Sequence, residues 1–276
     1  MTVAVPGVPP GVETRVEAGV ARQRGARAAV HGGRLVLDRN LKLFRNPASM
    51  AGMILFPLIF FLGFNLIMTR TLDRIGIEAA QFLMPTVVVQ AMFFTAMSSA
   101  FYTAADRTSG LIGRLRTLPL HPAATILGRL GADVARSLVS IAVLVVAASI
   151  LGFRFEAGPV AAVGFVLVAL LFSVTLAAGF GGWVLGAADP TAVTQVMSVP
   201  YLPLLMLSTG FAPVEGFPGW LHPFVRWQPV SLTIDALRAL ADGGATTVAL
   251  LRALAVLAVL LTVFVVLASR AFRRVS

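Results

Sequence analysis

One short stretch of the sequence combines basic, apolar and helix-breaking residues at spacings that suit recognition of another protein. It reads DRTSGLIGRLRTLPLHP over residues 106–122. Leu111, Leu115 and Leu118 recur at i, i+4 and i+7, which places them on one face of a helix, and Ile112 widens that face. The pattern therefore predicts a short helix with a single apolar stripe.

The charged and capping residues of this stretch predict the limits of the helix and its mode of interaction. Arg107 and Arg114 share a second face, and Asp106 or Ser109 can cap the amino end. Pro119 ends the helix because it disfavours the α conformation of the residue before it. Such a helix can dock into a groove on a partner, with apolar anchors for affinity and charges for register, or it can lie flat on lipid. The pattern alone leaves both alternatives open.

The sequence offers no site for chemistry on a bound nucleotide or metal. Cysteine is absent, which excludes a disulfide, a thiol nucleophile and a Cys-ligated metal. No G-x-x-x-x-G-K-[ST] motif occurs, and Lys42 lacks a glycine-rich approach. His31, His121 and His222 are scattered along the chain, whereas metal ligands must converge. We expect no metal, no cofactor held by this chain and no P-loop for ATP.

Composition predicts an all-α integral membrane protein. The 276 residues are 58% hydrophobic and 12% charged, whereas a soluble domain carries about 25% charged residues. The mean hydropathy is +0.88. Because a spanning helix needs about 20 apolar residues, six transmembrane helices are predicted, at residues 47–68, 82–102, 134–151, 159–185, 193–211 and 247–268.

The distribution of charge predicts the orientation of these spans. The net charge is +10, and the basic residues concentrate before the first span, in the 103–133 loop and after the sixth span. The positive-inside rule then places both termini and this loop on the cytoplasmic side of the membrane, which we expect to be a bacterial plasma membrane. Because the arginines flank apolar segments, we expect contact with membrane lipids and not with nucleic acid.

The segments outside the spans fall into two kinds. Residues 1–33 are rich in Pro, Gly, Ala and Arg and are expected to form a disordered cytoplasmic tail. Residues 34–46 carry Leu37, Leu41 and Phe44 at helical spacing, which predicts an amphipathic interfacial helix, or a helix packed on a partner protein. Residues 47–276 are expected to form one six-span transmembrane domain.

Proline and aromatic residues crowd the external segment between the fifth and sixth spans. Prolines this dense prevent one continuous helix, so residues 212–231 are expected to form two short re-entrant helices that dip into the outer leaflet, with tryptophan at headgroup depth. A plain external loop is the alternative. The residues assigned to this segment are Gly210, Pro213, Pro218, Trp220, Pro223, Trp227 and Pro229.

Uncharged polar residues inside the predicted spans are candidates for a substrate path. They are Asn65, Gln90, Ser98, Gln195 and Thr209. The alternative is ordinary hydrogen bonding between helices. No ionisable residue falls at mid-depth of a predicted span, which counts against an ion-coupled carrier.

The strings DRTSGLIGRLRTLP and STGFAPVEGFPGWLHPFVRWQPVS together resemble one family of membrane proteins. This is the second class of ABC exporter permeases (ABC-2 type), above all the daunorubicin-resistance type of actinobacteria, including mycobacterial members that export complex lipids. The resemblance covers residues 34–276. It implies that the first string is a coupling helix seated in a cleft of the ATPase subunit, with contacts from Asp106, Arg107, Gly110, Leu111, Arg114, Leu115, Leu118 and Pro119. Thr108 stands where many relatives have a second acidic residue.

The resemblance also implies a function. The chain would be the permease subunit of an ATP-driven exporter of a lipid or a lipophilic, drug-like amphiphile. It would work as a homodimer or heterodimer of permeases with two ATPase subunits, which bind the ATP and Mg. An ion-coupled secondary multidrug carrier is the alternative, and a membrane scaffold or polytopic enzyme is a third.

Overall fold

The computed structural model describes residues 47–72, 78–110, 122–244 and 246–274, in which every regular element is helical. The chain divides into two units, of which the larger comprises residues 46–111 and 133–276. The predicted tail at 1–33 and the predicted interfacial helix at 34–46 lie outside the described residues. The description below concerns the larger unit.

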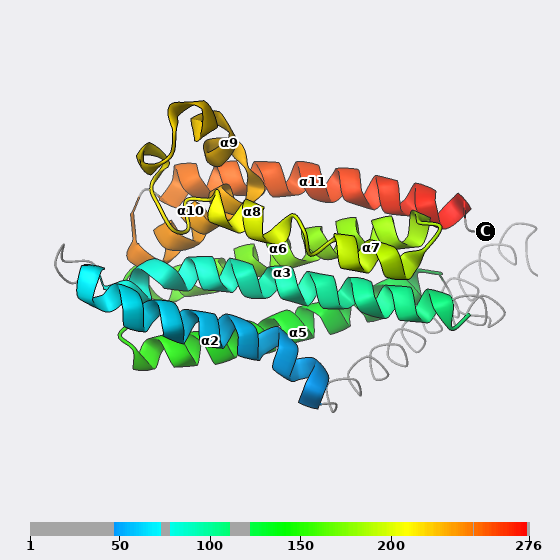
Figure 1. Cartoon of the computed structure of the whole chain (residues 1–276), viewed down its shortest axis with the longest axis horizontal. Coiled ribbons are helices and arrows are strands. Elements are labelled where there is room, and N and C mark those ends of the chain that lie inside the picture. The colour runs from blue at the N-terminus through cyan, green and yellow to red at the C-terminus, as the bar shows by residue number, and fades with distance from the viewer. Residues whose placement is uncertain (1–46, 73–77, 111–121, 245, 275–276) are drawn as a thin grey trace, which may run out of the picture. The chain divides into compact units, whose positions relative to one another are not determined.

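Five long helices form the frame of this unit and run alongside one another, with α5 belonging to it from residue 133 onward (Figure 1). They are α2 (Pro47–Leu72), α3 (Ala79–Thr108), α5 (Pro122–Ile150), α6 (Gly158–Gly186) and α11 (Thr246–Arg274). In four of them, namely α3, α5, α6 and α11, an apolar stretch is long enough to cross a membrane, and α2 holds a shorter apolar stretch, Ile54–Arg70. The all-helical fold is therefore confirmed, and four helices among the described residues are long and apolar enough to cross a membrane.

The fifth predicted span, residues 193–211, is not one continuous helix. It comprises two short helices, α7 (Pro190–Val196) and α8 (Tyr201–Met206), which are joined by turns. Pro200 is the residue directly before α8. A helix cannot continue unbroken from α7 through this position, because proline lacks the N–H that donates the backbone hydrogen bond. Neither piece can span about 30 Å of hydrocarbon, because a helix rises 1.5 Å per residue.

Residues 212–231, the segment predicted to be external, contain more elements than the two short helices expected. The segment contains η2 (Val214–Gly216), η3 (Gly219–Leu221) and α9 (His222–Trp227), and it leads into α10 (Pro229–Asp242). Pro213 and Pro218 precede η2 and η3, Pro223 lies in the first turn of α9, and Pro229 begins α10. Each proline therefore starts an element, because its fixed φ suits the first turn of a helix.

Helix α3 forms the centre of the unit, and α11 forms part of its outside. In the most apolar 18-residue stretch of α3, 83% of the residues are buried, compared with 11% in the corresponding stretch of α11. Helix α3 contacts α2, α6, α7 and α10. On α11, apolar side chains such as Leu251, Val259 and Val263 are exposed, which is the surface a lipid-facing helix needs.

Two glycines allow α6 and α11 to approach closely. A Cβ atom added to Gly179 would lie 2.8 Å from the ring of Phe264, and one added to Gly182 would lie 3.0 Å from the Cα atom of Ala268. The neighbour of Gly182 is backbone and cannot rotate away. Close approach through small residues is a common way for membrane helices to pack, since lipid provides little hydrophobic drive between them.

We predict that Gly182→Ala destabilises the purified protein in detergent by about 1–3 kcal/mol, because the added methyl group meets the α11 backbone. The adjacent variant Gly181→Ala is the matched control, since its Cβ atom would meet only the Thr103 hydroxyl, at 3.9 Å. Thermal unfolding followed by tryptophan fluorescence compares the two. Equal midpoints for the two variants would contradict the close α6–α11 packing.

Candidate functional site

The last turn of α3 carries the first residues of the predicted coupling helix. Asp106 and Arg107 lie inside α3, so Asp106 does not begin a new helix as the sequence suggested, and Ser109 is the residue that closes the carboxyl end of α3. Gly110 has φ +69°, and its N–H donates to the carbonyl of Arg107 at 3.2 Å. This hydrogen bond is one half of a Schellman motif, which needs glycine at this left-handed position. Helix α3 therefore ends before the leucine stripe begins.

The rest of the predicted coupling helix is outside the described residues. This group comprises Leu111, Arg114, Leu115, Leu118 and Pro119. Their helical arrangement and their contact with an ATPase remain predictions.

Arg107 holds the carboxyl end of α6. Its Nη1 donates to the carbonyl of Val184 at 2.8 Å and to the carbonyl of Ala187. The last carbonyls of a helix lack partners within the helix, and they carry the negative end of its dipole. A guanidinium at this position both satisfies these acceptors and interacts favourably with the dipole.

Helix α7 begins directly after the α6 end that Arg107 holds. Asp189 caps α7, and its Oδ1 accepts from the N–H groups of Thr191 and Ala192 at 2.8 and 3.1 Å. At the other end of α7, Met197 is fully buried in a small apolar cluster with Ala100 and other residues of α3 and α6. Both ends of α7 are therefore fixed to their surroundings.

A buried ion pair links α5 to α3 and was not anticipated from the sequence. Asp133 and Arg136, both buried, form a salt bridge one turn apart on α5. The hydroxyl of Ser99 on α3 donates to Asp133 at 2.8 Å, and the guanidinium of Arg136 lies over the Tyr102 ring, 5.0 Å from its centre. Opposite charges at i, i+3 are the sequence signal for this pair.

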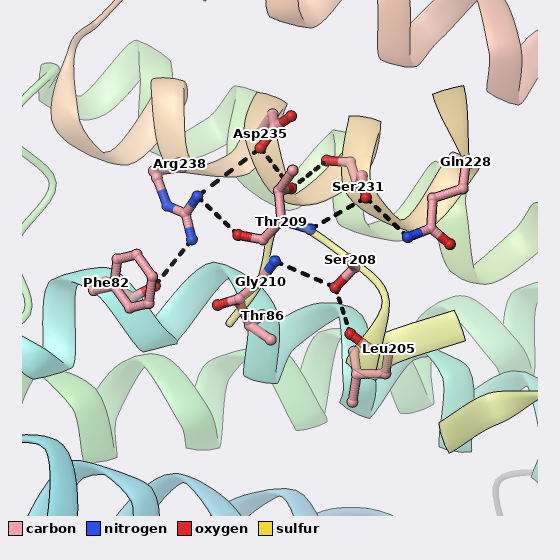
Figure 2. Close-up of polar contacts among 10 residues, drawn as sticks. All are labelled: Phe82, Thr86, Leu205, Ser208, Thr209, Gly210, Gln228, Ser231, Asp235 and Arg238. Atoms are coloured by element: carbon pink, nitrogen blue, oxygen red, sulfur yellow. Dashed lines mark hydrogen bonds and ion pairs between the residues drawn. The ribbon is translucent and has the colours of Figure 1, made fainter. Parts of the chain in front are cut away.

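A second polar cluster surrounds the turn after α8, which we call the α8 exit turn (residues 207–210). Gln228, which directly precedes α10, and side chains of α10 provide the hydrogen-bond partners that this non-helical backbone needs (Figure 2). Gln228 donates to the carbonyl of Leu207, and the hydroxyl of Ser231 accepts from the N–H of Thr209 at 3.2 Å. Backbone groups in an apolar setting must be satisfied in this way.

Charged residues complete this cluster. The hydroxyl of Thr209 donates to Oδ1 of Asp235 at 2.7 Å, and Arg238 lies 3.9 Å from the same carboxylate. Arg238 also donates to the carbonyls of Thr209 and Phe82, at 3.3 and 3.4 Å, and its guanidinium covers the Phe82 ring (Figure 2). One arginine of α10 therefore connects the α8 exit turn to the start of α3.

Partial burial sets the electrostatics of this charged pair on α10, since the side chains of Arg238 and Asp235 are 24% and 42% exposed. Helix α10 is not one of the four long apolar helices. Burial raises the pKa of the Asp235 carboxyl, against the opposing effects of the Thr209 hydrogen bond and the Arg238 charge. Burial also lowers the pKa of the Arg238 guanidinium, while Asp235 and Asp242 oppose that shift. Each group is therefore less favourably ionised here than in water.

Gly210 allows the α8 exit turn to lie directly against α3. The hydroxyl of Thr86 donates to the Gly210 carbonyl at 3.1 Å. A Cβ atom on Gly210 would lie 2.7 Å from Thr86 Cγ2 and 3.1 Å from Ile234 Cδ1. The position is therefore closed to any side chain.

The five residues proposed for a substrate path lie on α2, α3, α7 and the α8 exit turn. No hydrogen bond joins any two of them in the described part of the chain. Gln90 is buried in α3, Ser98 is half-buried and Gln195 is exposed on α7. Asn65 accepts a hydrogen bond from Thr69 of its own helix through its backbone carbonyl, and Thr209 belongs to the cluster around Asp235.

Within the described ranges, no three His, Asp or Glu side chains gather as metal ligands would. His222 instead pairs its Nε2 with the Phe217 carbonyl at 2.8 Å in the external segment. Trp220 and Trp227 of the same segment are strongly exposed. Exposed tryptophan of this kind suits the headgroup region of a membrane.

We predict that Gly210→Ala destabilises the protein by about 1–3 kcal/mol, because the methyl group would force Thr86 and the α8 exit turn apart. The control is Gly216→Ala in the same external segment, where the nearest atom would be the Ala212 Cβ at 3.5 Å, an ordinary contact. Thermal unfolding in detergent measures both variants. A midpoint for Gly210→Ala equal to that of the control would contradict the packing described.

We also predict a distinctive pH dependence for Asp235→Asn. Because the folded pKa of Asp235 is raised, this carboxyl contributes stability that is fully present below its unfolded pKa of about 4 and is lost as the pH rises through the folded pKa. Wild type should therefore gain stability relative to Asp235→Asn as the pH is lowered from 7 towards 4. A difference in unfolding midpoint that stays constant over this range would contradict the burial of the carboxylate.

Comparison with known proteins identifies the family. Residues 33–241 match the family model of the ABC-2 type transporter. A daunorubicin resistance ABC transporter permease from Streptomyces coeruleorubidus is 32% identical over 255 residues, 92% of this chain and 90% of the relative. A doxorubicin resistance ABC transporter permease from Mycobacterium tuberculosis is 31% identical over 232 residues, 78% of this chain and 80% of the relative. The resemblance inferred from the two sequence strings is confirmed, and the chain belongs to the ABC-2 type transporter family of membrane permeases.

Proposed function

We propose that the chain is the permease subunit of an ATP-driven exporter in a bacterial plasma membrane, with both termini in the cytoplasm. The observation that carries this proposal is family membership over most of the chain, together with four helices long and apolar enough to span. The exporter moves a lipophilic amphiphile out of the cytoplasm or the inner leaflet. Six crossings of the membrane are part of the proposal, with α7 and α8 together forming the fifth.

Energy reaches the permease from a separate ATPase, which binds ATP and Mg. The leucine stripe of Leu111, Leu115 and Leu118 docks in a cleft of the ATPase, and closure of the ATPases moves this segment as a lever. Nucleotide must favour one arrangement of the spans over another, because a ligand shifts an equilibrium only by its differential affinity. A second permease, identical or not, completes the exporter.

The names of the relatives guide the proposal for the cargo. They are permeases for daunorubicin and doxorubicin resistance, and an amphiphile of that size and polarity, or a lipid, suits a permease with so much exposed apolar surface. Doxorubicin is therefore a rational first probe. Its intrinsic fluorescence also makes transport directly measurable.

One observation favours the alternative of an ion-coupled carrier. The Asp133–Arg136 pair is buried in a candidate span, and ionisable residues in spans often lie on ion pathways. However, the two charges neutralise each other, and Ser99 supplies a further hydrogen bond. This arrangement suits a structural link better than a coupling-ion site.

We predict that Leu115→Asp abolishes co-elution of the ATPase and doxorubicin-stimulated ATP hydrolysis, because a carboxylate replaces the central apolar anchor. Thr117→Asp, which adds the same charge on the opposite face of the predicted helix, is the control and should retain both. Co-expression with ATPases encoded beside the permease, followed by affinity purification, provides the measurement. Unimpaired co-elution of Leu115→Asp would refute the docking assignment.

A further inference from the structure

We propose that Arg107 is a positioning residue that transmits movement of the coupling segment to α7, and that it is not a contact residue for the ATPase. This inference rests on the proposed ATP-driven function and specifies one link within it. It also departs from the role that the family resemblance implies for Arg107. The argument uses the hydrogen bonds of Arg107, the caps of α7 and the place of both in the chain.

The first step is the connection between α3 and α6. Two carbonyls at the end of α6, those of Val184 and Ala187, accept from the same guanidinium nitrogen. Charged hydrogen bonds of this kind are about twice as strong as neutral ones. Because the bonds run from the last turn of α3 to the last turn of α6, they fix the two helix ends to each other.

The second step is the path from α6 to α7. Ala187 is the residue that closes α6, and Asp189, two residues later, caps α7. Because this connection is so short, the start of α7 must move when the end of α6 moves. The far end of α7 leads into the turns at 197–200, where Val199 is 68% exposed.

The third step is the link to the driving force. Arg107 lies three residues before Gly110, where α3 ends, and the predicted coupling segment follows at once. A lever motion of that segment therefore acts first on the last turn of α3. The side chain of Arg107, in this turn, bonds both α6 carbonyls. It is therefore placed to transfer the motion through the end of α6 to α7 and to the turns at 197–200 that follow α7.

Arg107 is also poorly placed to bind an ATPase directly. Its side chain is half-buried, and its Nη1 already bonds two carbonyls of its own chain. Withdrawing it towards a partner would take a charged donor away from two carbonyls at the end of α6. The observed contacts therefore favour a role inside the permease.

The first test uses the permease alone in detergent. In Arg107→Gln, hydrogen exchange at the α7 amides from Val193 to Met197 should accelerate by about tenfold, as expected from the loss of one charged hydrogen bond. Arg70→Gln, which removes an exposed arginine from the last turn of α2, is the matched control and should leave α7 exchange unchanged. Unchanged exchange at α7 in Arg107→Gln would overturn the proposal, whether or not an ATPase binds.

The second test uses the complex with the ATPase. The chain has no cysteine, so Val199→Cys provides a single reporter, and its rate of maleimide labelling is compared with and without Mg-ATP and vanadate. The nucleotide-dependent change in rate should disappear when Arg107→Gln is added, whereas the ATPase still co-elutes. Arg107→Lys, which keeps the cation near the α6 carbonyls, should restore part of the change and serves if the glutamine variant folds poorly.

The results distinguish three situations. Loss of ATPase co-elution in Arg107→Gln would mean that Arg107 is a contact residue, and a retained nucleotide response at Val199→Cys would mean that α7 is moved by another route. Either result overturns the proposal. Failure of the unmodified permease to bind any ATPase would instead refute the proposed function, and the exchange experiment would still decide whether Arg107 holds α7.

Discussion

Backbone groups at helix breaks need donors and acceptors from within the protein, because hydrocarbon offers none. Among the side chains that meet this need, three are long donors from neighbouring segments. Arg107 binds the end of α6, Gln228 binds the α8 exit turn, and Arg238 binds both that turn and the start of α3. The rest of the arrangement depends on these bonds, since without them the broken course of α7 and α8 would leave polar groups unsatisfied.

The same bonds give the permease two places at which helices can be repositioned together. At one, the end of α3, the end of α6 and the start of α7 are joined through Arg107 and Asp189. At the other, α10 holds the α8 exit turn against Thr86 of α3. Between them lies the broken α7–α8 element, which is in turn linked to the central helix at both sites. A permease driven from its cytoplasmic side needs such an element, because rigid neighbours can then change its angle without unfolding it.

Hydropathy predicted the long helices well, because a run such as 159–185 is apolar throughout and matches α6 (Gly158–Gly186) closely. It did not anticipate that 193–211 is divided into two short helices, because Pro200 and Pro203 interrupt a stretch that is mostly apolar. Helix α10 was overlooked because it follows a proline-rich stretch, although Val230, Ile234 and Leu237 have helical spacing. The contacts of Arg107 and the burial of Asp133 and Arg136 depend on which helices become neighbours, which one sequence does not specify.

The central claim is that this chain forms the transport path and obtains its energy from a separate ATPase. Its most direct test is doxorubicin transport in vesicles that contain the purified permease, with or without its ATPase, under an imposed proton gradient or with Mg-ATP. The account predicts movement of doxorubicin against its gradient only when the ATPase and Mg-ATP are both present, with no effect of dissipating the proton gradient. Uphill movement driven by the proton gradient in vesicles that lack the ATPase would contradict it.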